Sequence, residues 1–286
     1  MVMLVQVSAH CWVRQSDFCQ SSTVVVTGGE DVLVIDPGVT GVELTLLAHE
    51  LKALGLTPTI GFSTHPHWDH MLWVRDLGDG PRWATPRAVE HAQANLEDAR
   101  AKAGRLAPGN EAGLIGQLTA LPVGAGTLQW SGPLLEVLEH DGHAPGHAAL
   151  YLPDDGVLVA GDMLSDVEVP LLDLKSGAPD PLRDYERGLS RLEHVLAGGC
   201  RVVIPGHGAV ATGEDVATRF TQDRSYLDAL PRPDPVLDAR LDPDATYGPD
   251  WLIPEHVAQR AWCLGMTEDP NAMQRENAAR TEEPGA

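Results

Sequence analysis

The residues best suited to chemistry in this sequence lie at positions 64–70, which read Thr-His-Pro-His-Trp-Asp-His. Three imidazoles and one carboxylate fall within this segment, directly after a short run that predicts a β-strand. His65 and His67 can face the same way at a strand end because alternate residues share a face. Asp69 and His70 are adjacent and point in different directions, which suits a second ion nearby. Nitrogen and oxygen donors without thiolate favour zinc, and they also accept iron or manganese.

One short loop cannot complete two coordination spheres, so further ligands must come from other parts of the chain. Three more candidate donors each lie beside a glycine and next to one end of a predicted strand: His143, Asp162 and His207. Glycine allows a tight backbone turn and a close approach to an ion. The positions therefore predict that loops distant in sequence converge on one metal site.

Two groups of strands alternate with helices along the chain. β-branched and apolar runs predict strands at residues 3–7, 23–27, 32–35, 59–63, 134–138, 148–152, 157–160 and 201–204. Helical spacing predicts helices at 42–54, within 87–121, and at 184–196, 214–229 and 255–264. This order predicts an α/β fold with two sheets face to face and helices outside. Residues 231–249, rich in Pro and Asp, predict an irregular wrap, and the tail from Glu268 is expected to fray.

The composition narrows the class of protein. The 286 residues carry a formal net charge of −21, which disfavours binding to a phosphate backbone. No stretch approaches the roughly 18 apolar residues of a membrane span, and the first ten residues lack the features of a secretory signal. The four scattered cysteines predict free thiols. We therefore expect a cytoplasmic protein with a small-molecule substrate, without nucleic-acid or membrane partners; the sequence carries no signal of oligomeric state.

These motifs, taken in order, give the chain a specific resemblance over roughly residues 1–212. It resembles the metallo-β-lactamase-fold hydrolase superfamily, whose pattern is matched by Asp36, His65, His67, Asp69, His70, His143, Asp162 and His207. The resemblance implies a four-layer αββα sandwich with a dinuclear metal site in the cleft between the sheet edges. Beyond it, we expect residues 213–286 to form a C-terminal helical and irregular extension that caps this site.

The resemblance assigns a role to each matched residue. One metal ion would be bound by His65, His67 and His143, the other by Asp69, His70 and His207, and Asp162 would bridge them. Asp69 would also orient the nucleophile and pass a proton to the leaving group, which makes it the candidate catalytic residue. Asp36 would brace the metal loops.

The implied activity is that of a dinuclear zinc hydrolase with two zinc ions per chain, iron or manganese being the alternatives. Metal-bound hydroxide would attack a small ester, thioester, lactone or amide, and the developing oxyanion would be stabilised by positive charge. No Gly-x-Ser-x-Gly motif offers a serine nucleophile instead.

Either His143 or His147 could be the ligand from the loop Asp-Gly-His-Ala-Pro-Gly-His. The superfamily pattern places the ligand at the first histidine, which favours His143. His147 would then orient a ligand or pack the loop.

The chain also departs from the pattern of its relatives. Met71-Leu72-Trp73 replaces the usual small residues, so the pocket wall is bulkier, and Met163-Leu164-Ser165 stands where acyl-homoserine lactonases usually carry a tyrosine. Two other functions stay open: a mononuclear iron oxygenase of the persulfide-dioxygenase kind, and a non-catalytic metal-stabilised binding module. Asp69 and His207 together argue against the iron oxygenase.

Overall fold

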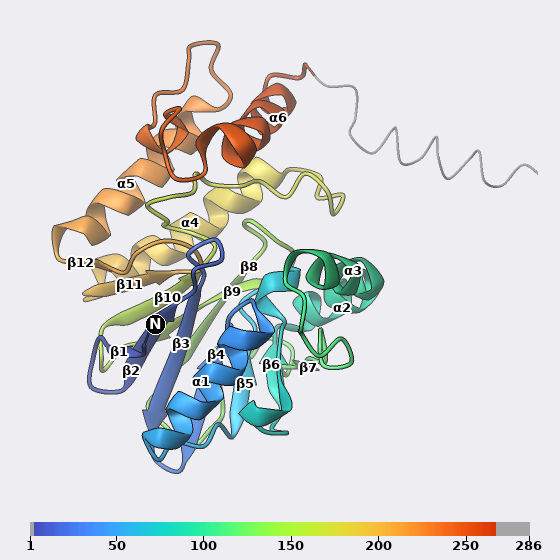
Figure 1. Cartoon of the computed structure of the whole chain (residues 1–286). Coiled ribbons are helices and arrows are strands. Elements are labelled where there is room, and N and C mark those ends of the chain that lie inside the picture. The colour runs from blue at the N-terminus through green and yellow to red at the C-terminus, as the bar shows by residue number, and fades with distance from the viewer. Residues whose placement is uncertain (1–2, 267–286) are drawn as a thin grey trace, which may run out of the picture.

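Two β-sheets packed face to face form the centre of the structure, and helices cover both outer faces (Figure 1). The computed structural model describes residues 3–266. Within them, one sheet has seven strands in the order β1-β2-β3-β4-β5-β6-β7, and the other has five in the order β12-β11-β10-β9-β8. No helix among the described residues has the length and apolar character required to span a bilayer.

The strands are short, and most pair antiparallel. The first sheet contains β1 (Val5–Gln6), β2 (Cys11–Gln15), β3 (Ser22–Gly28), β4 (Asp31–Ile35), β5 (Ile60–Phe62), β6 (Arg82–Ala84) and β7 (Thr119–Ala120). The second contains β8 (Glu136–His140), β9 (His147–Leu152), β10 (Val157–Gly161), β11 (Val202–Pro205) and β12 (Ala211–Thr212). The pairs from β4 to β7 and the pair β10–β11 are parallel. The loops that carry the candidate ligands leave β5, β8, β10 and β11 at their carboxyl ends, and the carboxyl ends of parallel strands are where ligands of α/β sheets bind.

The helices form the outer layers. They are α1 (Gly41–Ala53), α2 (Pro86–Ala94), α3 (Leu96–Leu106), α4 (Pro181–Ala197), α5 (Glu214–Ala229) and α6 (Ile253–Cys263), with short turns η1 (Trp68–His70), η2 (Arg75–Leu77), η3 (Ala239–Leu241) and η4 (Gly248–Leu252). Thr40 and Glu43 start α1 with a capping box, in which each side chain accepts from the other residue's backbone N–H. In Figure 1, α1 lies against the first sheet, and α4 and α5 lie against the second.

The central strands are buried on both faces, and alternate side chains divide between two cores. On β3, Val24 and Val26 enter the core between the sheets, whereas Val25 packs with the buried side chains of α1. On β9, Leu150 enters the same central core, and Tyr151 packs with the side chains of α4. This division produces four layers.

The predicted αββα sandwich with a helical C-terminal part is confirmed, and most elements lie within a few residues of their expected bounds. The prediction missed β2, whose sequence Cys-Trp-Val-Arg-Gln contains one β-branched residue; pairing with β1 and β3 makes it a strand. It also missed β7, because the Ala-rich character of residues 87–121 indicates helix, and the short strands β6 and β12, which have three and two residues. The expected tail from Glu268 lies outside the described residues.

Leu150 is fully buried in the core between the sheets, so shortening its side chain should destabilise the protein. We expect Leu150→Ala to lower the free energy of unfolding by about 2–5 kcal/mol, since it leaves a cavity between the sheets. Val123→Ala is the control: this side chain is 91% exposed, and the change should stay within roughly 0.5 kcal/mol. Urea denaturation of both variants measures the difference, and equal midpoints would contradict the packing described.

Candidate metal centre

The first group of converging donors combines three histidines with a carboxylate. His67 Nδ1 lies 3.0 Å from His65 Nε2 and 3.0 Å from His143 Nε2. Asp162 Oδ2 lies 3.4 Å from His65 Nε2 and 3.3 Å from His143 Nε2. The ligand atoms of all four residues lie within 4.8 Å of one another.

The second group shares Asp162 with the first. His70 Nε2 lies 3.3 Å from His207 Nε2 and 3.7 Å from Asp69 Oδ2, and His207 Nε2 lies 3.5 Å from Asp69 Oδ2. Asp162 Oδ1 lies 3.3 Å from His70 Nε2, and Asp162 Oδ2 lies 3.5 Å from His207 Nε2. The structure thus brings all seven predicted site residues together, in the two sets that the resemblance implies.

These distances fit a pair of bound cations. Tetrahedral ligands with bonds of 2.0–2.1 Å lie roughly 3.3 Å from one another, which is the spacing of the donors here. The buried Asp162 Oδ1 has no hydrogen-bond partner among the described residues, and a buried oxygen of this kind is costly unless something positive faces it. The donor set is therefore chemically suited to metal ions, and Asp162 is the residue placed to contact both.

Hydrogen bonds hold the outer nitrogens of His65, His70 and His207 and direct their inner nitrogens toward the centre. Asp36 accepts from the Thr64 hydroxyl at 2.6 Å and lies 2.9 Å from His70 Nδ1. Thr64 Oγ1 in turn lies 3.0 Å from His65 Nδ1. One carboxylate, Asp36, thereby orients a candidate ligand of each group, in agreement with the bracing role expected for it.

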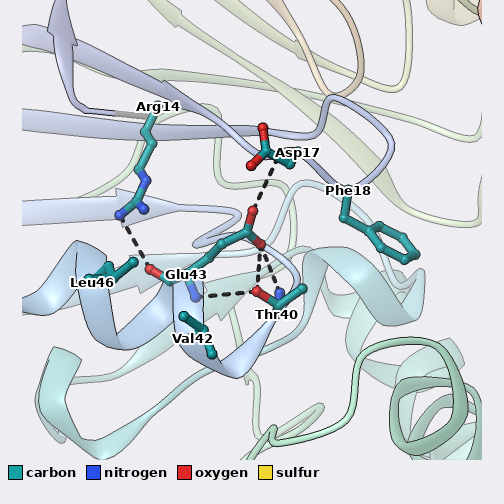
Figure 2. A pocket seen from close by; sticks show the side chains of 7 residues that line it. All are labelled: Arg14, Asp17, Phe18, Thr40, Val42, Glu43 and Leu46. Atoms are coloured by element: carbon teal, nitrogen blue, oxygen red, sulfur yellow. Dashed lines mark hydrogen bonds between the residues drawn. The ribbon is translucent and has the colours of Figure 1, made fainter. Parts of the chain in front are cut away.

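His207 is oriented by a backbone carbonyl: its Nδ1 donates to Cys19 O at 2.8 Å. The loop at residues 16–20 that carries this carbonyl is anchored by Glu43, which accepts from Ser16 Oγ at 2.6 Å and from Asp17 N at 3.2 Å. Figure 2 shows the contact between Asp17 and Glu43 in a surface pocket of about 480 Å³. None of the converging donors lines this pocket.

Backbone strain is concentrated around the centre. The non-glycine residues with positive φ in the described part of the chain are Cys19, Gln20, Asp36, His143 and Leu164. Each is a candidate ligand, contacts one, or belongs to a loop that carries one. Such conformations cost of order 1–3 kcal/mol each and persist at functional sites where the surroundings impose them.

Two glycines allow the loops to approach closely. A side chain at Gly206 would overlap Asp162 Oδ1, and a side chain at Gly161 would overlap the ring of His147. Gly161 also has φ +57°, in the region that favours glycine. Gly206, beside His207, is therefore required by contact, and Gly161, beside Asp162, by contact and by conformation.

The structure separates the tasks of His143 and His147. His143 Nε2 is one of the converging donors, whereas His147 Nε2 accepts from the Asp162 backbone N–H at 3.2 Å. The His147 ring is fully buried and stacks between His65 and His140, with centroid distances of 5.1 and 4.5 Å. His147 therefore positions Asp162 and His65, which is the role expected if His143 supplies the ligand.

The fields within the cluster keep its carboxylates ionised. Burial alone would raise the pKa of Asp162, but His70, His207 and His65 hold that pKa well below its usual range. Burial would lower the pKa of His70, yet Asp162, Asp36 and Asp69 raise it well above its usual value. Burial lowers the pKa of His65 to about 4. Several carboxylates thus remain charged in a small buried volume, which favours cations.

Sequence reasoning missed a clamp from the C-terminal part. Arg240 on η3 is 5% exposed, and its Nη1 donates to Ser165 O at 3.0 Å and to Glu168 O at 2.9 Å, in the loop that follows Asp162. Asp223 on α5 pairs with Arg240 at 2.6 Å and accepts from Leu164 N at 3.0 Å. This buried pair therefore fixes the backbone beside Asp162.

Sequence reasoning also missed Glu168, which lies in the loop that follows Asp162. Its carboxylate is 4.0 Å from His207 Nδ1, and the side chain is 7% exposed. Burial raises the pKa of Glu168 to about 7, although His207 opposes the shift. No spacing rule identifies this residue, because the loop that carries it follows no motif.

Comparisons with known proteins agree with the fold and the site. The model of the metallo-beta-lactamase superfamily matches residues 16–207. The probable metallo-hydrolase YqgX of Bacillus subtilis (strain 168) is 28% identical over 197 residues, which is 66% of this chain and 85% of that protein. The protein TTHA1623, which has been solved in a di-iron-bound form, is 29% identical in sequence to this chain. The structural match has a TM-score of 0.52 and covers 69% of this chain and 92% of TTHA1623.

A third similar structure matches in fold alone. The sec-alkylsulfatase Pisa1 from Pseudomonas sp. is 16% identical with a TM-score of 0.68, and the match covers 100% of this chain and 52% of that one. Fold and donor set together define a metal-dependent hydrolase. The chain belongs to the metallo-beta-lactamase superfamily.

The position of Asp36 predicts an effect on metal binding. We expect Asp36→Asn to weaken zinc affinity about 10- to 100-fold. Asp36 Oδ2 contacts both the Thr64 hydroxyl and His70 Nδ1, and Oδ1 accepts from Thr64 N at 2.9 Å, so the NH₂ group of an amide cannot replace either oxygen. Asp155→Asn is a matched control: Asp155 is equally buried and accepts from His10 N and lies 2.7 Å from His10 Nδ1, but it contacts none of the donors. Competition with a chelator measures the zinc affinity of both variants. Equal losses of affinity in the two variants would contradict the role of Asp36 in orienting the ligands.

The contacts of Arg240 with the loop after Asp162 also predict an effect on zinc affinity. Arg240 Nη1 contacts Asp223, Ser165 O and Glu168 O, while Nε and Nη2 donate to Asp238 and hold the guanidinium in place. Arg240→Lys keeps a charge opposite Asp223 but loses the two donors to Asp238, so the hold on the loop should weaken and zinc affinity should fall about 10-fold. Arg260→Lys is the control, because Arg260 also donates to three backbone carbonyls of the C-terminal part, remote from the metal loops. Circular dichroism should show that both variants are folded. If the zinc affinity of Arg240→Lys is then unchanged, Arg240 does not hold the Asp162 loop in place for metal binding.

Proposed function

We propose that this chain is a dinuclear zinc hydrolase that cleaves a small ester, thioester, lactone or amide. The observation that supports it most directly is the arrangement of seven donors in two groups that share Asp162. A single-ion site would need only one of these groups. The net charge of −21 supports a small-molecule substrate over a nucleic acid.

In this proposal each group binds one ion: His65, His67 and His143 hold the first, Asp69, His70 and His207 hold the second, and Asp162 contacts both. Two divalent cations at such a site acidify water and polarise a carbonyl. The residues of the chain supply the rest. Asp36, Thr64 and the Cys19 carbonyl fix the histidine tautomers, so that unprotonated nitrogens face the ions.

Asp69 is the candidate catalytic residue because of its place at the edge of the cluster. Its side chain is 15% exposed, whereas the side chains of His65, His70 and His207 are at most 5% exposed. One carboxylate oxygen faces His70 and His207. Asp69 can therefore orient an attacking water from the solvent side and carry its proton to the leaving group.

Zinc is proposed because histidine and carboxylate donors at these spacings suit tetrahedral ions. Iron is the main alternative, since TTHA1623 has been solved in a di-iron-bound form, and manganese accepts the same donors. We also propose that residues 1–212 form the catalytic domain and that the extension at 213–286 covers the substrate side of the site. The buried contacts of Arg240 and Asp223 with the Asp162 loop support this division of roles.

The proposal is tested by metal removal and a ligand substitution. Chelation should abolish hydrolysis across a panel of esters, thioesters, lactones and β-lactams, and about two equivalents of zinc should restore it. His67→Ala should lose more than the roughly 10- to 100-fold typical of residues that only support a ligand. His194→Ala, an exposed histidine on α4, should retain full activity.

If His67→Ala retains hydrolytic activity, the candidate metal site is not required for the reaction. If the protein binds about one iron ion per chain and consumes oxygen in the presence of persulfides, it is an iron oxygenase and not a hydrolase. A metal-loaded protein that turns over no substrate of the panel would favour a binding module.

A further inference from the structure

His143 differs from other histidines of the centre in how its ring is held. Hydrogen bonds fix the outer nitrogens of His65, His70 and His207. The outer nitrogen of His143, Nδ1, is buried and has no hydrogen-bond partner in the described part of the chain. Its inner nitrogen, Nε2, still faces the centre, 3.3 Å from Asp162 Oδ2. The direction of this ring therefore depends on packing and on the backbone of its loop.

The loop that carries His143 is closed by the side chain of Asp141. Asp141 Oδ1 accepts from Gly146 N at 2.9 Å, so this hydrogen bond encloses residues 142–145. His143 has φ +72° and Gly146 has φ +70°, both in the left-handed region. For a histidine this conformation is unfavourable, and it persists only where the surroundings impose it. The closure by Asp141 supplies part of that constraint.

The first turn of α2 holds the closed loop from the outside. Arg87 pairs with Asp141 Oδ2 at 2.5 Å, and Thr85, which caps α2, donates from its hydroxyl to Gly146 O at 2.5 Å. The approach is close, since a side chain at Gly146 would overlap the backbone nitrogen of Ala88. Both carboxylate oxygens of Asp141 and both backbone polar groups of Gly146 therefore have partners, which fixes the loop against the helix.

We propose that Asp141 is a positioning residue for the first metal ion. Asp141 is not one of the converging donors; it acts through the Gly146 N–H, which holds the backbone that directs His143 to the centre. This inference rests on the proposed dinuclear function and deepens it by naming a residue that affects one ion of the pair. His143 belongs to the first group of donors, so the ion bound by the second group should be unaffected.

The test measures the two binding steps separately. Metal-free protein is titrated with Co²⁺, whose visible absorption reports its ligands, and competition with a chelator gives both affinities; His67→Ala identifies the step that belongs to the first ion. We expect Asp141→Ala to weaken this step about 10- to 100-fold and to change its spectrum, with the second step as in the wild type. Asp141→Leu, which keeps side-chain volume, replaces Asp141→Ala if that variant does not fold.

The conservative variant separates loop closure from charge. Asp141→Asn keeps an oxygen that can accept from Gly146 N and loses only the charge opposite Arg87. Its first-ion affinity should stay within about fivefold of the wild type, as should that of Arg87→Gln, because this ion pair is partly exposed and contributes little. An equal loss in Asp141→Asn and Asp141→Ala would overturn the inference, as would wild-type affinity in Asp141→Ala.

Asp31→Ala is the matched control. Asp31 is half-buried like Asp141, and its carboxylate also anchors a loop, accepting from Ser131 N and from Thr59 Oγ1, both at 2.8 Å. It lies at the other end of β4 from Asp36 and contacts none of the converging donors. Both Co²⁺ affinities should match those of the wild type, and a loss equal to that of Asp141→Ala would contradict a specific role for Asp141.

Hydrogen exchange of the metal-free protein separates failure of the inference from failure of the proposed function. If the wild type binds fewer than two ions, the proposed dinuclear function fails. Peptides that cover residues 141–147 should still exchange faster in Asp141→Ala than in the wild type or Asp31→Ala, because the Gly146 amide loses its acceptor. Unchanged exchange of these peptides would refute the role of Asp141 whatever the metal content.

Discussion

The structure depends on one electrostatic constraint: the ligand atoms of seven side chains converge on a small volume. His67 Nδ1 lies 3.0 Å from two imidazole nitrogens, and Asp162 lies within 3.5 Å of four histidines. Donors so placed repel one another unless positive charge lies among them. The surrounding hydrogen bonds and strained residues are consistent with a scaffold that keeps these donors in place against that repulsion.

The scaffold achieves this through strands that are buried on both faces. β10 lies in the middle of the second sheet with all five of its residues buried, so its carboxyl end is held rigidly where Asp162 begins the next loop. β11 runs parallel to it and brings His207 to the same edge. An isolated bridge between Ser21 and His207 then joins this edge to the first sheet. The site is thus positioned by rigid elements, and only the loops are specialised for the ligands.

The sequence predicts the centre of the site well and its surroundings poorly, for a physical reason. Histidine and aspartate are rare enough that their clustering after a strand is informative, and all seven predicted residues do meet. The Cys19 carbonyl could not be predicted, since every residue carries a carbonyl and only the fold selects this one. Arg240 and Glu168 were also missed, because their partners lie far away in sequence or in a loop without a motif. His147 was expected to support the ligands, but its contact with the Asp162 backbone required the folded structure.

The same buried contacts couple the two sides of the site. Ser165 donates to the His207 carbonyl at 2.7 Å, and its own carbonyl accepts from Arg240, which pairs with Asp223 on α5. Arg219, also on α5, donates to the Ala209 carbonyl at 2.6 Å, just beyond His207. A displacement of the C-terminal segment would therefore move the loops of Asp162 and His207 together. Because interfaces packed in this way shift as units, the C-terminal segment is mechanically linked to the loops that carry the candidate ligands Asp162 and His207.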